Sequence, residues 1–104
     1  MADFADGKRL LILQLLLQHG ERTGGQLAAM DERLDRDTIY VTLLRMEKQK
    51  RWLKSRKERV SRLPGPPARY YRVTGEGETA ARIGEMVEAA RAGAVIVRPE
   101  RSTR

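Results

Sequence analysis

The stretch from Asp35 to Lys48 reads DRDTIYVTLLRMEK and decides the fold, because it has the pattern of an amphipathic helix. Asp35 is a residue type that caps a first helical turn through its side-chain oxygen. Ile39, Leu43 and Met46 recur at helical spacing and form one apolar stripe. At about 100° per residue, the opposite face carries Asp37, Val41, Leu44, Arg45 and Lys48, with Tyr40 on its flank. This outer face therefore mixes basic and apolar groups.

Two further helices are predicted on the N-terminal side of this stretch. Residues from Phe4 to Gln18 favour a first helix that ends at Gly20, and its second half is apolar almost all round. A helix of that kind needs two different neighbours to cover it. Thr23 followed three residues later by Gln26 has the spacing of a capping box, which predicts a short second helix.

A hairpin and a last helix are predicted on the C-terminal side. Helical periodicity lapses from Trp52 to Lys57, and residues 69–73 (RYYRV) have the aromatic and β-branched content of a strand. Between these two strands lies a basic tip that contains Pro64, Gly65, Pro66 and Pro67. We expect Trp52 in the core, and one of the two tyrosines buried with the other exposed. Thr74 is placed to cap the last helix.

The order helix, helix, helix, strand, strand, helix is that of a winged helix-turn-helix with an additional C-terminal helix, mainly α with a small β-hairpin. The sequence leaves open whether a further short strand forms around Thr23. We expect one domain over residues 1–93 and a disordered tail over residues 94–104, which offer little to pack.

The positive charge is concentrated in the middle of the chain. The 104 residues carry a formal net charge of +7, and the window from Arg45 to Arg72 alone holds eleven basic residues against Glu47 and Glu58. The remainder of the chain is slightly acidic. Such a block favours polyanions such as nucleic acid, although a solvated basic loop is the plainer alternative. A membrane surface is less favoured, because no amphipathic helix with a lysine-rich face is attached to the block.

Composition argues against several other classes of protein. The chain has no cysteine, and His19 is the single histidine, so neither a thiol nucleophile nor a histidine–cysteine metal site can form. No nucleophile with a base, no glycine-rich phosphate loop and no cofactor motif is present, which predicts that the protein is not an enzyme. The longest apolar run, Leu10 to Leu17, is too short to span a bilayer and does not resemble a signal peptide. We therefore expect a cytoplasmic protein.

Two segments carry a resemblance to a known family. Thr38-Ile39-Tyr40 with the following Leu43, Arg45, Met46 and Glu47 is one, and the string GPPARYYRVT over residues 65–74, with Glu76-Gly77, is the more specific other. Together they resemble the PadR-like family of bacterial transcriptional regulators, from about Leu10 to about Ile83. The resemblance implies that the Thr-Ile-Tyr helix is the recognition helix and that the predicted hairpin is the wing, which touches the DNA backbone. It also implies that the protein acts as a dimer. It makes Thr38 and Tyr40 candidate DNA contacts and Arg69 a candidate phosphate contact.

The chain departs from the family pattern at two places. Lys50 stands where the family usually has a glycine after the third helix. Many members also have a longer C-terminal helical region, which bears on dimerisation and on effector binding.

Chemistry and resemblance together give a set of candidate site residues. Arginine binds phosphate oxygens bidentately, and an exposed helix face with polar and basic groups suits the major groove. The candidate DNA contacts are Arg36, Thr38, Tyr40, Arg45, Lys48, Arg56, Lys57, Arg59, Arg62 and Arg69. The candidate dimer contacts on the first and last helices are Leu11, Ile12, Leu15, Ile83, Met86 and Val87.

The resulting hypothesis is a sequence-specific regulator that binds double-stranded DNA as a homodimer and needs no cofactor. Alternatives stay open at four positions. Thr38 can be helix-start chemistry and Tyr40 a packing residue, while Val41 and Leu44 can meet thymine methyl groups or a protein partner. The second hypothesis is accordingly a winged-helix interaction module that modulates another regulator or a polymerase.

Overall fold

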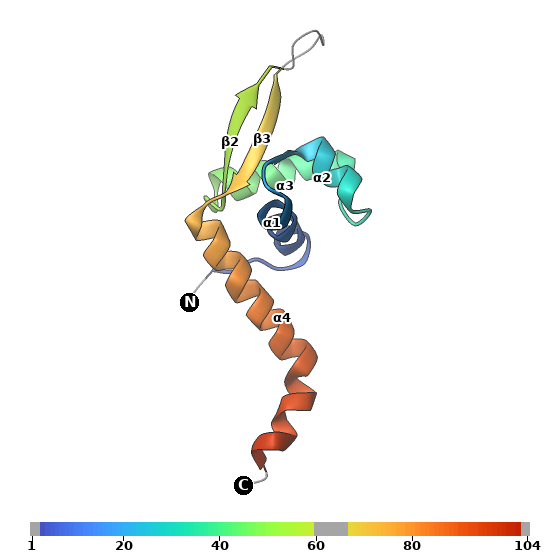
Figure 1. The fold of residues 1–104 in the computed structure, drawn as a ribbon, viewed down its shortest axis with the longest axis vertical. Coiled ribbons are helices and arrows are strands. Elements are labelled where there is room, and N and C mark those ends of the chain that lie inside the picture. The colour runs from blue at the N-terminus through green and yellow to red at the C-terminus, as the bar shows by residue number, and fades with distance from the viewer. Residues whose placement is uncertain (1–2, 60–66, 103–104) are drawn as a thin grey trace.

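The computed structural model describes residues 3–59 and 67–102, with side chains described up to residue 93. Seven elements follow one another: α1 (Gly7–His19), β1 (Arg22–Thr23), α2 (Gly24–Met30), α3 (Arg36–Lys48), β2 (Leu53–Glu58), β3 (Ala68–Val73) and α4 (Gly75–Ser102). The β2–β3 hairpin and α4 project in opposite directions from the packed helices (Figure 1).

Helix α1 runs through the core and supplies four of its buried side chains, Leu10, Ile12, Leu13 and Leu16. It ends before Gly20, as the sequence predicted, and this glycine has a φ of 86°. Its start is later than predicted, at Gly7 instead of Phe4. The preceding segment lies against α4 instead of forming a helical turn. Ala5 is fully buried there, and its backbone N–H donates to the Ala80 carbonyl at 3.2 Å.

Helices α2 and α3 begin at the caps that the sequence predicted. The Gln26 backbone N–H donates to Thr23 Oγ1 at 3.1 Å, and the Thr23 N–H donates to Gln26 Oε1 at 2.9 Å, which completes the capping box. The Asp35 carboxylate accepts from the Asp37 backbone N–H at 3.0 Å. The predicted core stripe of α3 is confirmed, since Ile39, Leu43 and Met46 are all buried.

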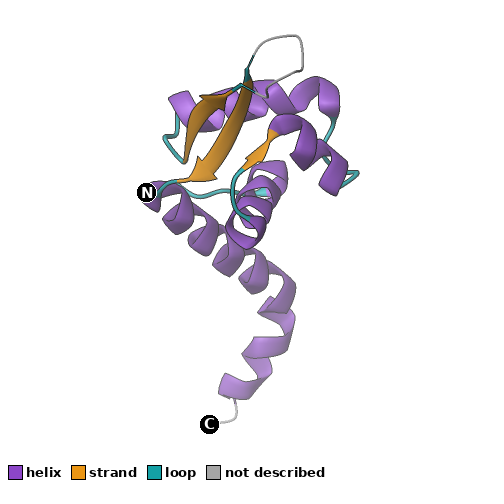
Figure 2. Ribbon diagram, turned by 45° about the horizontal axis from the view of Figure 1, so that its top comes forward, coloured by secondary structure: helices purple, strands orange, loops and turns teal. Residues whose placement is uncertain are grey.

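The strands form one antiparallel sheet in the order β1-β3-β2 (Figure 2). The predicted hairpin is confirmed, and the question of a further strand is answered by β1, which pairs with Tyr70 and Tyr71 of β3. Tyr71 is buried and Tyr70 half-buried, on opposite faces of β3. The prolines and glycine at positions 64–66 of the predicted tip lie outside the described residues.

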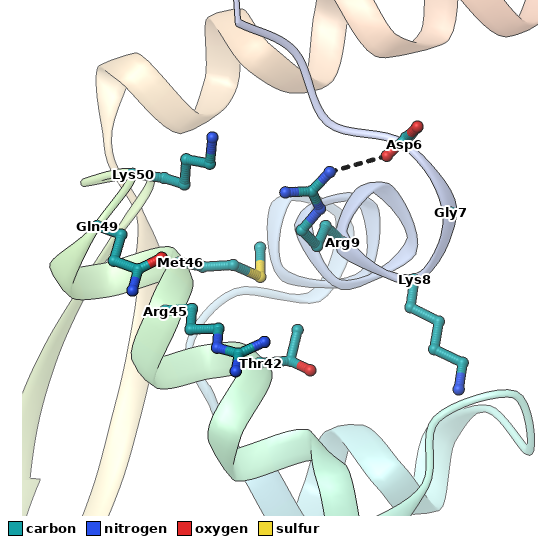
Figure 3. A pocket seen from close by; sticks show the side chains of 9 residues that line it. All are labelled: Asp6, Gly7, Lys8, Arg9, Thr42, Arg45, Met46, Gln49 and Lys50. Atoms are coloured by element: carbon teal, nitrogen blue, oxygen red, sulfur yellow. Dashed lines mark hydrogen bonds and ion pairs between the residues drawn. The ribbon is translucent and has the colours of Figure 1, made fainter.

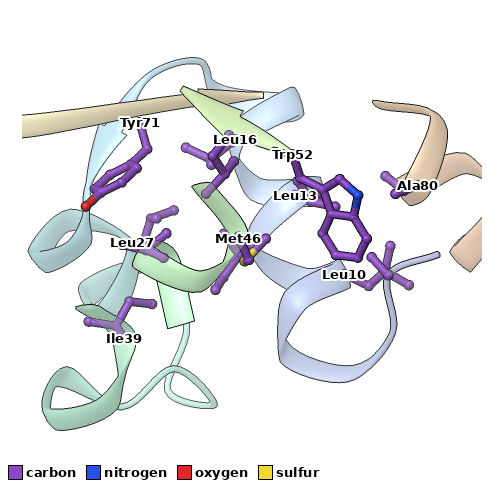
Figure 4. Packing of buried hydrophobic residues seen from close by; sticks show 14 of the residues in the cluster. Leu10, Leu13, Leu16, Leu27, Ile39, Met46, Trp52, Tyr71 and Ala80 are labelled. Carbon is purple, nitrogen blue, oxygen red and sulfur yellow. The ribbon is translucent and has the colours of Figure 1, made fainter. Parts of the chain in front are cut away.

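The core is continuous from the sheet to the start of α4. Trp52 is buried near Leu10 and Ala80, while Tyr71 lies toward Leu27 (Figure 4). The placement of Trp52 in the core is thus confirmed. Its backbone N–H also donates to the Met46 carbonyl at 2.9 Å, which ties the first residues of the hairpin to the end of α3.

Helix α4 is capped by Thr74, whose Oγ1 accepts from the Gly77 N–H at 3.0 Å. It continues to Ser102, past the point where the sequence predicted a tail without regular structure. Gly93 costs only about 1 kcal/mol relative to alanine inside a helix, so it is too weak a signal to end one. The division at residue 93 into a domain and a tail stays a prediction. The mainly helical winged-helix fold with a small sheet and an additional C-terminal helix is confirmed.

Candidate nucleic-acid interface

The outer face of α3 is exposed along its length. Tyr40, Val41 and Leu44 have exposed fractions of 53%, 49% and 52%. The predicted polar contacts of the helix are exposed as well: Arg36, Thr38, Arg45 and Lys48. Because the opposite stripe is buried in the core, α3 turns this outer face toward solvent.

Tyr40 lies over the first turn of α2, which sequence patterns did not reveal. A Cβ atom on Gly24 would come within 2.6 Å of the Tyr40 ring at Cε1, and one on Gly25 within 3.5 Å of the Tyr40 hydroxyl. The two glycines therefore leave room for the ring beside the N-terminus of α2. Tyr40 is both a packing residue on one edge and an exposed phenol on the other.

The cross-strand register divides the hairpin's side chains between two faces. Ser55 pairs with Tyr71 and Lys57 with Arg69, so these four residues share one face of the hairpin. The part of this face nearest the helices is buried in the core at Leu53 and Tyr71. Ser55 Oγ donates to Glu47 Oε2 of α3 at 2.7 Å, and Arg69 Nη1 donates to the same Ser55 oxygen at 2.9 Å. Lys57 and Arg69 are exposed and lie on the side of the hairpin that faces α3.

The other face of the hairpin holds Arg56 in internal contacts. Its Nη2 and Nε donate to Glu21 Oε1 at 2.8 and 3.0 Å, its Nη1 pairs with Glu58, and its guanidinium lies 5.0 Å from the centroid of the Tyr70 ring. Hydrogen bonding from Arg56 lowers the pKa of Glu21, against the smaller opposing effect of desolvation. The predicted phosphate contact at Arg56 therefore competes with a role in fixing β1 to the hairpin.

Two further predicted wing contacts, Arg59 and Arg62, follow β2 in the sequence. Arg59 is exposed directly after β2. Arg62 lies outside the described residues.

A pocket of about 640 Å³ lies between the start of α1 and the side of α3 (Figure 3). Its lining includes the cationic side chains of Lys8, Arg9, Arg45 and Lys50. Of these, Arg45 alone is a DNA contact predicted from the sequence. Arg9 pairs with Asp6 at 3.0 Å, so part of the positive charge is balanced within the protomer.

Lys50, which stands where the PadR-like family usually has a glycine, makes two contacts with neighbouring side chains. Its Nζ pairs with Asp3 at 3.0 Å and lies 5.7 Å from the centroid of the Trp52 ring. Helix α3 ends with Gln49 in right-handed backbone, and Arg51 takes the positive φ of 61°. The left-handed position thus falls one residue after the site where the family has glycine.

The predicted dimer residues differ in how much surface they offer. Ile12 is completely buried within the protomer, so this part of the prediction is wrong: the helix turns Ile12 into its own core instead of toward a partner. Leu11 and Leu15 are half-buried against the core. On α4, Ile83 and Val87 are half-buried and Met86 is 65% exposed. Gln14 Nε2 donates to Glu85 Oε2 at 3.0 Å, which joins α1 and α4 within one protomer.

Among residues 3–59 and 67–102, no helix is long and apolar enough to cross a membrane, and no group of three histidine, cysteine or acidic residues could hold a metal ion.

Comparison with solved structures connects this geometry to known proteins. A PadR family transcription regulator from Clostridium difficile matches with a TM-score of 0.67 and 26% identity over 85% of this chain and 92% of that chain. A PadR-like transcriptional regulator from Bacillus cereus gives 0.65 and 24% over 85% and 86%. A third structure, from Thermoplasma acidophilum, gives 0.62 and 20% over 92% and 91%. No family model and no curated protein sequence matches. The solved structures confirm the resemblance to the PadR-like family.

Proposed function

We propose that this PadR-like chain is a sequence-specific transcriptional regulator that binds double-stranded DNA as a homodimer, with α3 in the major groove and the basic wing on the phosphates. The proposal assigns it no enzymatic activity and no cofactor. Its support from known proteins is the likeness to transcription regulators of the PadR family.

The observation that carries the proposal is the shared side of α3 and the hairpin. The hydrogen bonds from Arg69 to Ser55 and from Ser55 to Glu47 hold the exposed Lys57–Arg69 pair on the side of the hairpin that faces α3. A protein that reads DNA needs such a combination, because groove contacts carry the sequence information and backbone contacts fix the register.

The proposed contacts fall into two groups. On α3 they are Arg36, Thr38, Tyr40, Arg45 and Lys48, which meet base edges and the adjacent phosphates. On the wing they are Lys57, Arg59, Arg62 and Arg69, which meet phosphates. We leave Arg56 out of the second group, because its guanidinium is held by Glu21 and Glu58.

The proposed dimer uses the half-buried and exposed apolar residues that remain at the junction of α1 and α4: Leu11, Leu15, Ile83, Met86 and Val87. A two-fold interface there would place the two α3 helices about one DNA turn, ~34 Å, apart for a palindromic site. Analytical ultracentrifugation should return a dimer at tens of micromolar protein. A clean monomer at that concentration would remove this part of the proposal.

A salt titration against random-sequence duplex DNA tests the central claim. We expect log affinity to fall linearly with log salt, with a slope of about −0.9 for each phosphate contacted. The second candidate function, a winged-helix module that binds a regulator or polymerase, is favoured by one observation, the exposed Val41 and Leu44. A regulator must show salt-dependent duplex binding and an interaction module of that kind need not, so the absence of such binding would overturn the regulator function and favour the module.

A further inference from the structure

Three apolar side chains are exposed together on α3, and this concentration calls for an explanation. The other large apolar side chains that are exposed in the described part of the chain, Leu17, Met30 and Met86, are single residues on three different helices. Scattered exposed apolar residues are ordinary, whereas contiguous ones mark a contact surface. Tyr40 lies against the first turn of α2, which leaves Val41 and Leu44 as the apolar pair on the outer face.

Val41 and Leu44 are neighbours, because residues three apart lie on the same side of a helix. Neither serves the fold: the core stripe of α3 is complete without them, and valine is a weaker helix former than most straight-chain residues. Both lie in the middle of the element that we propose for the major groove. The following inference therefore rests on the proposed function.

Two cations lie next to this apolar pair on the outer face of α3. Arg45 follows Val41 by four residues and Lys48 follows Leu44 by four, so each apolar side chain has an exposed basic neighbour one turn further along α3. No ion pair within the described residues involves Arg45 or Lys48. Asp37, four residues before Val41, is the acidic member of the face and lies in the first turn of the helix, where a carboxylate suits the helix dipole.

An apolar pair with basic neighbours on the same helix face matches one partner chemistry in particular. In the major groove, the C5-methyl group of thymine is the apolar feature of the base edges, and it lies between two rows of phosphates. We propose that Val41 and Leu44 are specificity-determining residues that contact thymine methyl groups, so that the chain prefers duplex sites with thymines at the positions facing the middle of α3. Arg45 and Lys48 then bind phosphates next to the contacted bases.

Replacing thymine by uracil tests this inference, because the exchange removes the methyl group and keeps the base pairing. A high-affinity duplex would first be selected from a randomised library with the wild-type protein, and each thymine would then be replaced singly by uracil. Burying a methyl-sized group is worth about 0.8 kcal/mol, so we expect about a fourfold loss of affinity at each contacted thymine and no change at the others. Fluorescence anisotropy at fixed salt measures both.

The variant Val41→Ala/Leu44→Ala should bind thymine and uracil duplexes equally well. Leu17→Ala is the matched control, since it removes a comparably exposed apolar side chain from α1 and should keep the wild-type discrimination. Thermal unfolding of all variants checks that the fold is kept.

Each outcome of this experiment decides something. Discrimination in the wild type that is lost in the double variant supports the inference. Tight binding of a selected duplex with no thymine sensitive to uracil overturns the inference and leaves the proposed function standing. A double variant that retains the discrimination does the same, and it would favour a protein partner as the contact of Val41 and Leu44. Failure to select any duplex above random DNA overturns the proposed function together with this inference.

Discussion

The outer face of α3 and the hairpin are two exposed basic regions of this chain, and they are built in opposite ways. On α3 the basic side chains stand among apolar and hydroxyl groups, and Arg45 and Lys48 have no ion-pair partner in the described structure. On the hairpin, basic residues stand on both faces, but Arg56 is held by two carboxylates and Arg69 donates a hydrogen bond to Ser55. A count of positive charges along the sequence cannot distinguish these two arrangements.

The hairpin has a structural face and a contact face, while α3 has a core face and a face proposed to read DNA. The hairpin's structural face is joined to the start of β1 through the Arg56–Glu21 bond, and its contact face is held by the hydrogen bonds from Arg69 to Ser55 and from Ser55 to Glu47. We therefore expect α3 to decide which sequence is bound and the hairpin to decide how strongly any duplex is bound. Changes to each region should separate these two properties.

The largest effect should come from breaking the joint that fixes the base of the hairpin. A Cβ atom on Gly77 would lie 2.2 Å from the Trp52 carbonyl oxygen, which already accepts from the Thr74 N–H at 2.9 Å. We expect Gly77→Ala to destabilise the fold by about 3 kcal/mol, because backbone must move on both sides of the contact.

Chemical denaturation measures this change. Gly75→Ala is the control, because its Cβ would meet nothing within 4 Å, and it should alter stability by less than about 1 kcal/mol. Equal effects of the two substitutions would show that the base of the hairpin is not held in this way.

Substitutions on α3 should come next and should act on sequence preference. We expect Tyr40→Ala and Arg45→Ala each to weaken binding to a selected site by about 1–3 kcal/mol, with a smaller effect on random duplexes, because base-edge contacts are lost. Competition binding with both duplexes measures the ratio. If both variants bind the selected site as wild type does, α3 is not the reading element.

Charge removal from the two hairpin faces should give a smaller, face-dependent effect. Lys57→Ala/Arg69→Ala removes a cross-strand pair from the contact face, and Lys54→Ala/Arg72→Ala removes an equal charge from the opposite face. We expect the first variant to make the salt slope shallower by about two and to weaken selected and random duplexes by similar factors, since phosphate contacts are lost. The second variant should leave the slope close to wild type, and identical slopes for the two would contradict the division into faces.

The smallest expected effect concerns the pH dependence of the structural face. Because Arg56 lowers the pKa of Glu21 below its usual value of 4.5, this pair stabilises the fold above that pH and loses its contribution as the pH falls through the lowered pKa. Arg56→Gln should raise the pKa of Glu21 back toward 4.5. Carboxyl NMR titration measures the change.

Asp31 provides the internal control for this titration, because hydrogen bonding from Arg33 holds its pKa at about 2 without any contribution from Arg56. A Glu21 pKa that does not respond to the substitution, with Asp31 unchanged, would contradict the assignment of Arg56 to the structural face.

Local patterns in the sequence were sufficient for the existence of the helices and the hairpin and for the starts of α2 and α3, but not for the start of α1 or the end of α4. Asp35 and Thr23 cap their helices with side-chain bonds that span two or three residues, and the stripe of Ile39, Leu43 and Met46 follows from helical periodicity alone. The exposure of the outer face of α3 follows from the same periodicity. These features depend on interactions within about one helical turn, which a sequence displays directly.

Tertiary structure decided which of the predicted residues share a face and which are already engaged. Arg56 meets Glu21 across 35 positions, and Ile12 is buried because α1 is surrounded on more than one side. Likewise, Lys57 and Arg69 share the α3 side only through the register of β2 against β3. Such contacts join segments far apart in the chain, so their partners are fixed by packing and strand register and not by any local spacing.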